Sequence, residues 1–469
     1  MFKIILLKEM RETIGSAKFV FSFSVCTVLI LLAFYVGARN YQVNRAQYEA
    51  SVRENLRQME GLTDWGQVES QIFLPPTPLA ALISGLSNDV GRSIKVEAVG
   101  ELISENSRYG EDPIYAVFRF LDLEFVFQVV LSLFAILLAY NAVNGEKEQG
   151  TLKLTFANAV PKDRYILAKL SGVFASVVVP MLLPILIGCG ILVIMDIPMN
   201  GSEWLRLAMI VVAGLLFFMV FLNLSIFVSA KTERSSYSFL ILLIAWIFFV
   251  LIVPRTSILL AGRAIDVPSI DEIHAQKFRN QSQLWTEDMQ KIDAFVPPSN
   301  DPEKAFAAFN TFMNTTRETR ETKIAEFNQR LNEDRNNRQA VQREWAFGIA
   351  RFSPATSLSL AVMSLAGTSH AIAQQFLDQA RSYQQSFAQF IKSKNNGETG
   401  GHMVRVKIGG APQEKAKPIN PYEIPAFHFQ SMSVGEYITP ALTDIGLLIG
   451  FNLMFFAGAV WAFSKFDVR

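Results

Sequence analysis

Six apolar stretches, each about 20 residues long or more, constrain what this chain can fold into. An α-helix of about 20 residues crosses roughly 30 Å of hydrocarbon, so each stretch predicts one membrane-spanning helix. Backbone groups find no water partner inside a bilayer, which restricts such segments to helices that pair their own backbone. The predicted spans are Ala17–Gly37, Leu121–Asn141, Tyr165–Met195, Trp204–Val228, Ser238–Leu260 and Thr443–Phe463.

The first stretch is expected to be an uncleaved span. A signal peptide is the alternative, but the lead before Ala17 is long and carries charges of both signs, such as Lys8, Glu9 and Arg11. No clear small-residue cleavage site follows. The chain is therefore expected to keep all six spans.

A large water-exposed part is also predicted. Hydrophobic residues make up 51% of the chain, yet charged residues still make up 18%. The net charge of +1 gives no reason to expect a nucleic-acid partner. The predicted regions are 1–37 with the first span, a first insert at 38–119, spans two to five at 120–262, a second insert at 263–437, and the last span with its tail at 438–469.

Basic residues in short loops predict the orientation. The loop 142–164 contains Lys147, Lys153, Lys162 and Arg164, whereas the short loop 196–203 contains no basic residue. Both termini and the loop 142–164 are therefore expected in the cytoplasm, which places both inserts outside. Arginines after the first span argue the other way, but they belong to a long loop, where the rule is weaker.

The inserts are expected to be mainly helical with a small β-sheet. Residues Pro302–Arg351 carry apolar side chains at steps of three and four and predict one long amphipathic helix. Ser269 with Glu272, and Ser353 before a proline, are typical of helix starts. Alternating residues at 94–98 and 404–408 indicate two strands, which we expect to share a sheet.

No catalytic motif is found in the sequence. The chain contains no phosphate-binding loop G-x-x-x-x-G-K-[ST], no dinucleotide fingerprint and no zinc-protease motif. His402 and His428 suggest copper binding as an alternative, but their spacing is irregular, and scattered exposed histidines are the favoured interpretation. We therefore expect a chain that is not an enzyme, with no catalytic residue and no metal site.

The polar loop between the second and third spans is the strongest clue to function. A short segment with both charge signs must lie at a membrane face, where its apolar side chains can press on a partner. Leu152, Leu154, Phe156 and Val160 are the apolar side chains in question. The sequence predicts a membrane protein with a docking loop.

This loop and its surroundings resemble the ABC-2-type permeases, the membrane subunits of one class of ATP-binding-cassette exporter. Residues Glu146–Leu152 read E-K-E-Q-G-T-L, and Pro161–Lys162 and Lys169–Gly172 follow at the positions of that family's E-x-E-x-G-T-L…P…K-L-x-G signature. The charged segment Lys8–Glu12 resembles the family's amphipathic N-terminal helix. The motifs L-P-P-T-P-L at Leu74–Leu79 and F-S-P-A at Phe352–Ala355 resemble a subfamily with enlarged extracytoplasmic domains.

The resemblance implies an all-α polytopic protein of the bacterial inner membrane, whose loop seats in a groove of a separate ATPase subunit. That subunit, rather than this chain, would bind ATP and magnesium. A second permease copy or a paralogue, membrane lipid and a periplasmic protein are further partners implied. The implied coupling residues are Glu146, Glu148, Gly150, Thr151, Leu152, Leu154, Phe156, Pro161 and Lys162. Among them, the two glutamates would meet basic residues of the ATPase, and Gly150 would permit a sharp turn.

Two alternatives to an exporter remain open. The large outer inserts also suit a mechanical transmitter, which uses ATP in the cytoplasm to move a periplasmic partner without transport. A membrane anchor or receptor without any ATPase is the third interpretation. Polar residues inside spans bear on this choice, because amides in lipid face a partner helix or a pathway. These residues are Gln128, Asn223, Ser225 and Asn452.

Overall fold

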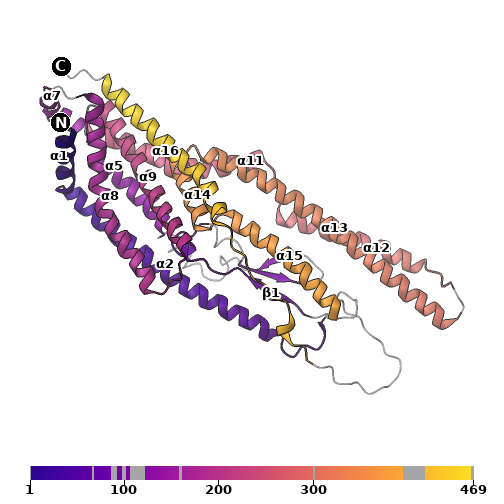
Figure 1. Ribbon diagram of the computed structural model, residues 1–469. Helices are drawn as coiled ribbons and strands as arrows, with labels where there is room; N and C mark the ends of the chain where they lie inside the picture. The colour runs from indigo at the N-terminus through magenta and orange to yellow at the C-terminus, as the bar shows by residue number, and fades with distance from the viewer. Residues whose placement is uncertain are drawn as a thin grey trace. The chain divides into compact units, whose positions relative to one another are not determined.

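The computed structural model describes residues 2–65, 68–85, 92–97, 102–105, 122–157, 161–298, 301–394 and 418–465 (Figure 1). Six helical segments within these ranges are long and apolar enough to cross a membrane, which confirms the prediction of an all-α polytopic protein with six spans. The chain divides into two compact units. Unit 1 comprises Met1–Pro254 and Arg351–Arg469, and unit 2 comprises Arg255–Ala350.

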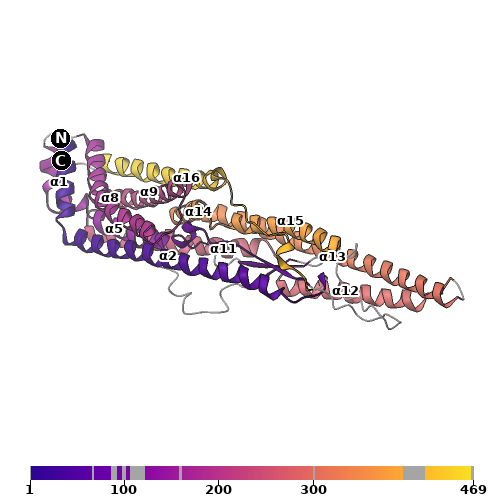
Figure 2. The same cartoon turned by 60° about the horizontal axis from the view of Figure 1, so that its bottom comes forward.

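Unit 1 contains most of the spanning helices. The first and third spans, α2 and α8, run side by side (Figures 1 and 2). The second and fifth spans each contain a π-helical turn, η5 and η6. The span elements are α2 Ala17–Gln58; α4 Leu123–Phe125, η5 Val126–Leu131, α5 Ser132–Ala139 and α6 Asn144–Glu148; α8 Lys162–Ile194; α9 Gly201–Lys231; α10 Ser235–Trp246, η6 Ile247–Ile252 and α11 Val253–Ala264; and α16 Val434–Ser464.

Two spans differ from their sequence patterns. Helix α2 starts at the cap Ser16 and continues to Gln58, so the first insert begins inside a helix rather than at its predicted end, Gly37. A helix of 42 residues is about 63 Å long, twice what the hydrocarbon requires. Helix α8 continues through Pro180 and Pro184, so these prolines do not break the third span.

The two inserts together build a second core in unit 1. Strands β1 (Ser70–Phe73), β2 (Ser93–Val96) and β3 (Ile103–Glu105) form an antiparallel sheet in the order β1-β2-β3. Helix α15 (His370–Lys394), from the second insert, buries Phe376 and Phe387 with Ile72 and Ile94 of the sheet. The predicted strand at 94–98 thus corresponds to β2. The predicted strand at 404–408 lies outside the described residues.

Helix α14 (Pro354–Ala366) belongs to the core formed by the spans, although the sequence placed it in the second insert. Its 13 residues measure about 20 Å, which is too short to cross the hydrocarbon. Ser353 caps the first turn, as predicted, and its hydroxyl also donates to the carbonyl of Phe249 in η6. Gly367 ends the helix with a φ of 71°. A short buried helix is therefore held between the spans.

Unit 2 is a helical hairpin of α12 (Ile270–Asp293) and α13 (Pro302–Ala350), preceded by most of α11. The long helix predicted from Pro302 is confirmed, and Ser269 caps α12 through the amide of Glu272. The remaining described elements are α1 Phe2–Ile14, η2 Pro78–Ala81, α7 Thr151–Phe156 and η7 Pro421–Glu423.

Candidate functional site

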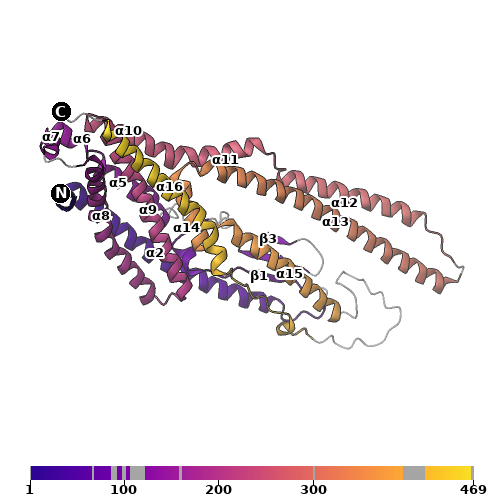
Figure 3. The same ribbon diagram turned by 45° about the horizontal axis from the view of Figure 1, so that its top comes forward.

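The loop 142–164 contains two short helices, α6 at the end of the second span segment and α7 after it. Gly150 separates them and has a φ of 72°, a left-handed conformation that side chains rarely adopt. A Cβ atom there would meet nothing within 4 Å, so the backbone conformation alone requires glycine. This confirms the predicted sharp turn at Gly150. Figure 3 shows α6 and α7 at the end of unit 1 where α1 begins and α16 ends.

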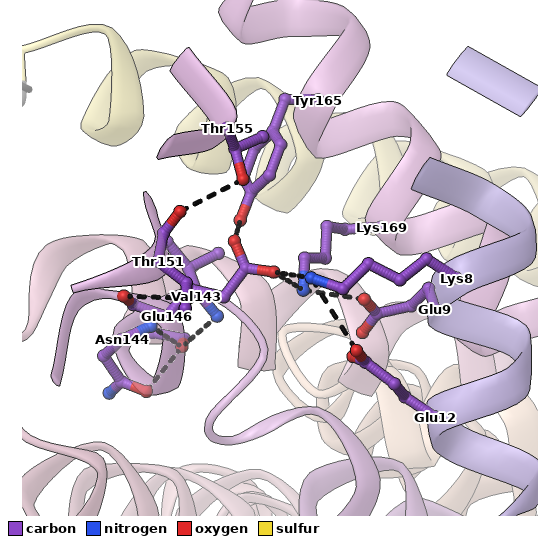
Figure 4. Close-up of polar contacts among 11 residues, drawn as sticks. Lys8, Glu9, Glu12, Val143, Asn144, Glu146, Thr151, Thr155, Tyr165 and Lys169 are labelled. Atoms are coloured by element: carbon purple, nitrogen blue, oxygen red, sulfur yellow. Dashed lines mark hydrogen bonds and ion pairs between the residues drawn. The ribbon is translucent and has the colours of Figure 1, made fainter. Parts of the chain in front are cut away.

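Glu146 of α6 is the centre of a buried polar cluster (Figure 4). Its Oε1 lies 3.1 Å from the Nζ of Lys8 on α1 and 3.0 Å from the Nζ of Lys169 on α8. Its Oε2 accepts a hydrogen bond of 2.6 Å from the hydroxyl of Tyr165. Charge-assisted bonds of this kind are about twice as strong as neutral ones. Side chains of α1 and α8 therefore meet at one carboxylate of α6.

Glu9 extends this cluster along α1. Its Oε2 lies 2.6 Å from the Nζ of Lys169, and its side chain is buried between α1 and α8. Burial raises the pKa of Glu9, although the neighbouring Lys169 opposes this shift. Gly172 of α8 makes the close approach possible, since a Cβ atom on Gly172 would lie 2.7 Å from the Cβ of Glu9.

The loop is also attached to the turn between α9 and α10. The amides of Val143 and Asn144 donate to the Ser229 hydroxyl over 3.0 and 3.1 Å. Lys147 donates to the carbonyl of Ala230 over 2.6 Å. Glu148 accepts from the amide and the hydroxyl of Ser235 over 2.7 and 3.0 Å. The loop is thus bound to α1, to α8 and to this turn.

These contacts distinguish the two glutamates that were expected to meet basic residues of a partner. Glu146 is only 9% exposed and is bound within the chain, whereas Glu148 is exposed and also accepts from Ser235. The sequence marked Lys8, Glu9 and Lys169 as parts of motifs, but it did not identify them or Tyr165 as members of the Glu146 cluster. Lys169 carried a signal, because a charged residue inside an apolar stretch needs a partner.

The apolar residues of the loop also divide into two kinds. Leu152 is 2% exposed and belongs to the core. The ring centroid of Phe156 lies 5.2 Å from that of Tyr165 and 5.5 Å from that of Phe463. Leu154, in contrast, is 71% exposed. Leu152 and Phe156 therefore anchor α7 to its own chain, and Leu154 is the exposed one of these three side chains. Val160 lies outside the described residues.

The other three loop residues serve local structure. The Thr151 hydroxyl donates to the carbonyl of Glu146 over 3.4 Å across the Gly150 turn. Pro161 is the N-terminal cap of α8, where a missing amide hydrogen has no consequence. Lys162 donates to the carbonyl of Ser464 over 3.0 Å, which ties the start of the third span to the end of the sixth.

The four polar residues predicted inside spans all make contacts within this chain. The Asn223 amide donates to Asn452 Oδ1 over 2.9 Å, and Asn452 donates to the carbonyl of Leu216 over 3.0 Å. Gln128 donates to Ala355 and Ser359 of α14, both over 3.4 Å, and Ser225 donates to the carbonyl of Phe221 on its own helix. The hydrogen bonds of Asn223, Asn452 and Gln128 thus join different helices, and that of Ser225 stays within α9.

Among the described residues, no group of three or more His, Cys, Asp or Glu side chains could hold a metal ion. His402 lies outside these residues.

Comparison with protein families matches residues 3–468, nearly the whole chain, to the model described as "ABC-2 family transporter protein". A search of curated proteins found no match.

Proposed function

The chain belongs to the ABC-2 transporter family, and we propose that it is the permease subunit of an exporter driven by a separate ATP-binding-cassette ATPase. The observation that supports this proposal most directly is the loop 142–164. It presents Leu154 outward on α7, and the adjoining helix α6 is bound to α1, α8 and the start of α10. A partner that moves Leu154 would move the core with it.

The transmission is proposed to start at α7. ATP binding would draw two ATPase subunits together, and α7 would follow the groove that holds Leu154. Because Glu146 joins the loop to α1 and α8, these helices would move as one body and shift the spans between two arrangements. ATP and magnesium would be bound by the ATPase subunit alone.

The proposal also includes the pairing of the permease and its orientation in the membrane. Two permease copies, or this chain and a paralogue, would pair in a bacterial inner membrane. The loop, α1 and the end of α16 gather at one end of unit 1 (Figure 3), so an ATPase at the loop would make that end cytoplasmic. Both chain termini would then be cytoplasmic and the inserts outside, as the basic residues predict.

The docking proposal is tested with Leu154→Asp. The tagged chain is purified from its own host's membranes, and copurifying ATP hydrolysis and labelling by an azido-ATP probe are measured. Loss of both is expected, because a carboxylate has no partner in an apolar groove. The matched control is Val296→Asp, the same kind of change at an exposed aliphatic residue in the segment between α12 and α13. Unchanged ATPase recovery with Leu154→Asp would contradict the proposal.

Mechanical transmission without transport is a second candidate. It is favoured by the hydrogen bonds of Asn223, Asn452 and Gln128 to other helices of the same chain, which leave these amides paired rather than free to line a pathway. Both candidate functions use an ATPase, but only the exporter moves a substrate across the membrane. An assay of substrate movement in sealed vesicles, with ATP hydrolysis measured in parallel, separates them.

A further inference from the structure

Large apolar side chains remain exposed on α11 and on the last turns of α13 in unit 2. Gln342 of α13 donates to the carbonyl of Ile265, just beyond α11, over 2.9 Å and fixes the two segments together. On α11, Ile258 and Leu259 are each 67% exposed. On α13, Val341 is 46% and Trp345 is 56% exposed. In water, this much apolar surface would be unfavourable.

The length of the fifth span indicates what covers these residues. The candidate span Ser235–Ala264 has 30 residues, or about 45 Å of helix. The hydrocarbon measures roughly 30 Å and the whole bilayer about 40 to 45 Å. A helix that starts at one face near Ser235 therefore reaches the opposite headgroup region within α11. Ile265 follows this span directly, and its contact with Gln342 brings the end of α13 to the same level.

The mixture of side chains on α11 is typical of that region. Arg255 and Arg263 are exposed among the aliphatic residues of the same helix. Arginine can place its stem along acyl chains and its charge among headgroups, and tryptophan is enriched at the same level. Nearer the N-terminus of α13, exposed ion pairs such as Asp334 with Arg338 are suited to water.

We propose that the base of unit 2, made of α11 and residues 341–350 of α13, lies in the headgroup region of one leaflet and contacts lipid, with Trp345 as its interfacial anchor. The C-terminal turns of α13 thus contact the membrane, although the helix as a whole is too polar for hydropathy to indicate this. The hairpin beyond them projects into water. This inference depends on the six spans and is independent of the ATPase, so the two proposals fail separately.

The test uses tryptophan fluorescence of the full chain in phosphatidylcholine vesicles. In one variant, Trp345 is the single tryptophan and the other five are changed to Phe. In the matched control, Trp285 of α12, which is 43% exposed, is the single tryptophan. Lipid with bromine near the headgroup end of the acyl chains should lower Trp345 emission roughly twofold, because an interfacial ring lies at that depth. Trp285 emission should not change.

Two outcomes would overturn the proposal. Trp345 quenched only by aqueous acrylamide, like Trp285, would place it in water. Trp345 quenched by neither agent would mean that protein covers it.

A second measurement avoids the tryptophan replacements. A spin label at Val341→Cys, in a chain with Cys26 and Cys189 changed to Ala, should collide with oxygen in preference to a water-soluble nickel chelate. The same label at Asp334→Cys should show the opposite preference. A nickel preference at Val341 would refute the lipid contact.

Discussion

The loop end of unit 1 and the hairpin of unit 2 both bury an acidic side chain, but they pair it differently. In unit 1, Glu146 accepts from Lys8, Lys169 and Tyr165, which come from two other elements. In unit 2, Asp288 is 2% exposed and pairs with Arg320 across the hairpin over 2.9 Å and with Lys291 on its own helix over 3.1 Å. The first arrangement joins distant parts of the chain, and the second sets the alignment of two neighbouring helices.

The two clusters should differ in how much stability is lost when one member is removed. Lys169 is almost completely buried, whereas Lys291 and part of Arg320 remain in contact with water. A buried charge that loses its partner has no solvent to replace it, and a half-exposed one does. Damage to the loop cluster should therefore exceed damage to the hairpin pair.

The largest effect is expected for Lys169→Met. It leaves the buried carboxylates of Glu9 and Glu146 without their shared cation. The free energy of unfolding should fall by about 3 to 5 kcal/mol. Denaturant titration of the purified chain in mild detergent measures the loss. The double variant Lys169→Met with Glu9→Gln should regain part of it. A loss below about 1 kcal/mol would show that the cluster is solvated.

Gly172→Ala should have the next largest effect, because a Cβ atom there overlaps Glu9 at 2.7 Å. Overpacking of this kind destabilises by about 1 to 3 kcal/mol. Hydrogen exchange of the α1 amides should rise as α1 leaves α8. Gly190→Ala in the same helix is the control, since its Cβ would meet nothing within 4 Å. Equal exchange in the two variants would mean that close packing does not hold α1.

In the hairpin, Asp288→Ala should destabilise by about 1 to 3 kcal/mol, less than Lys169→Met, because Arg320 can turn to water. Faster hydrogen exchange confined to α12 and α13 is the expected readout. Asp334→Ala removes an exposed ion pair with Arg338 from the same hairpin and should change little. An Asp288→Ala effect as large as that of Lys169→Met would contradict the proposed difference between the regions.

A neutral pair extends the comparison to the middle of the span core. Asn452→Leu removes the hydrogen bonds to Asn223 and to the Leu216 carbonyl. Hydrogen bonds between membrane helices average only about 0.6 kcal/mol. Denaturant titration should therefore show a small loss. A loss of several kcal/mol would mean that this amide pair is as important as the charged cluster.

The smallest effect concerns pH. Because burial raises the pKa of Glu9 above its usual 4.5, the folded state favours the protonated acid. The stability from Glu9 is present in full below its unfolded pKa and is lost as the pH rises through the raised folded pKa. Glu9→Gln cannot ionise, so thermal unfolding from about pH 4 to about pH 7 should show the wild type falling relative to the variant. Parallel pH profiles would contradict this.

The position of the candidate site could largely be predicted from the sequence. Which of its side chains face the core and which face outward could not. The order of charges and glycine in Glu146–Leu152 marks the loop, and Gly150 makes the predicted turn. The inward direction of Phe156 depends on Tyr165 of α8 and Phe463 of α16, and the latter lies near the other end of the chain. A local pattern holds no information about such neighbours.

The sequence by itself determined the six spans, the long helix from Pro302 and the starts at Ser269 and Ser353, because hydropathy and capping act between residues near each other in the chain. Only the tertiary structure decided that α14 lies in the span core, that α15 completes the sheet domain, and that Glu146 faces inward. Each of these depends on contacts between segments far apart in the sequence. Burial and ion pairing are properties of that assembled neighbourhood, and no single segment contains them.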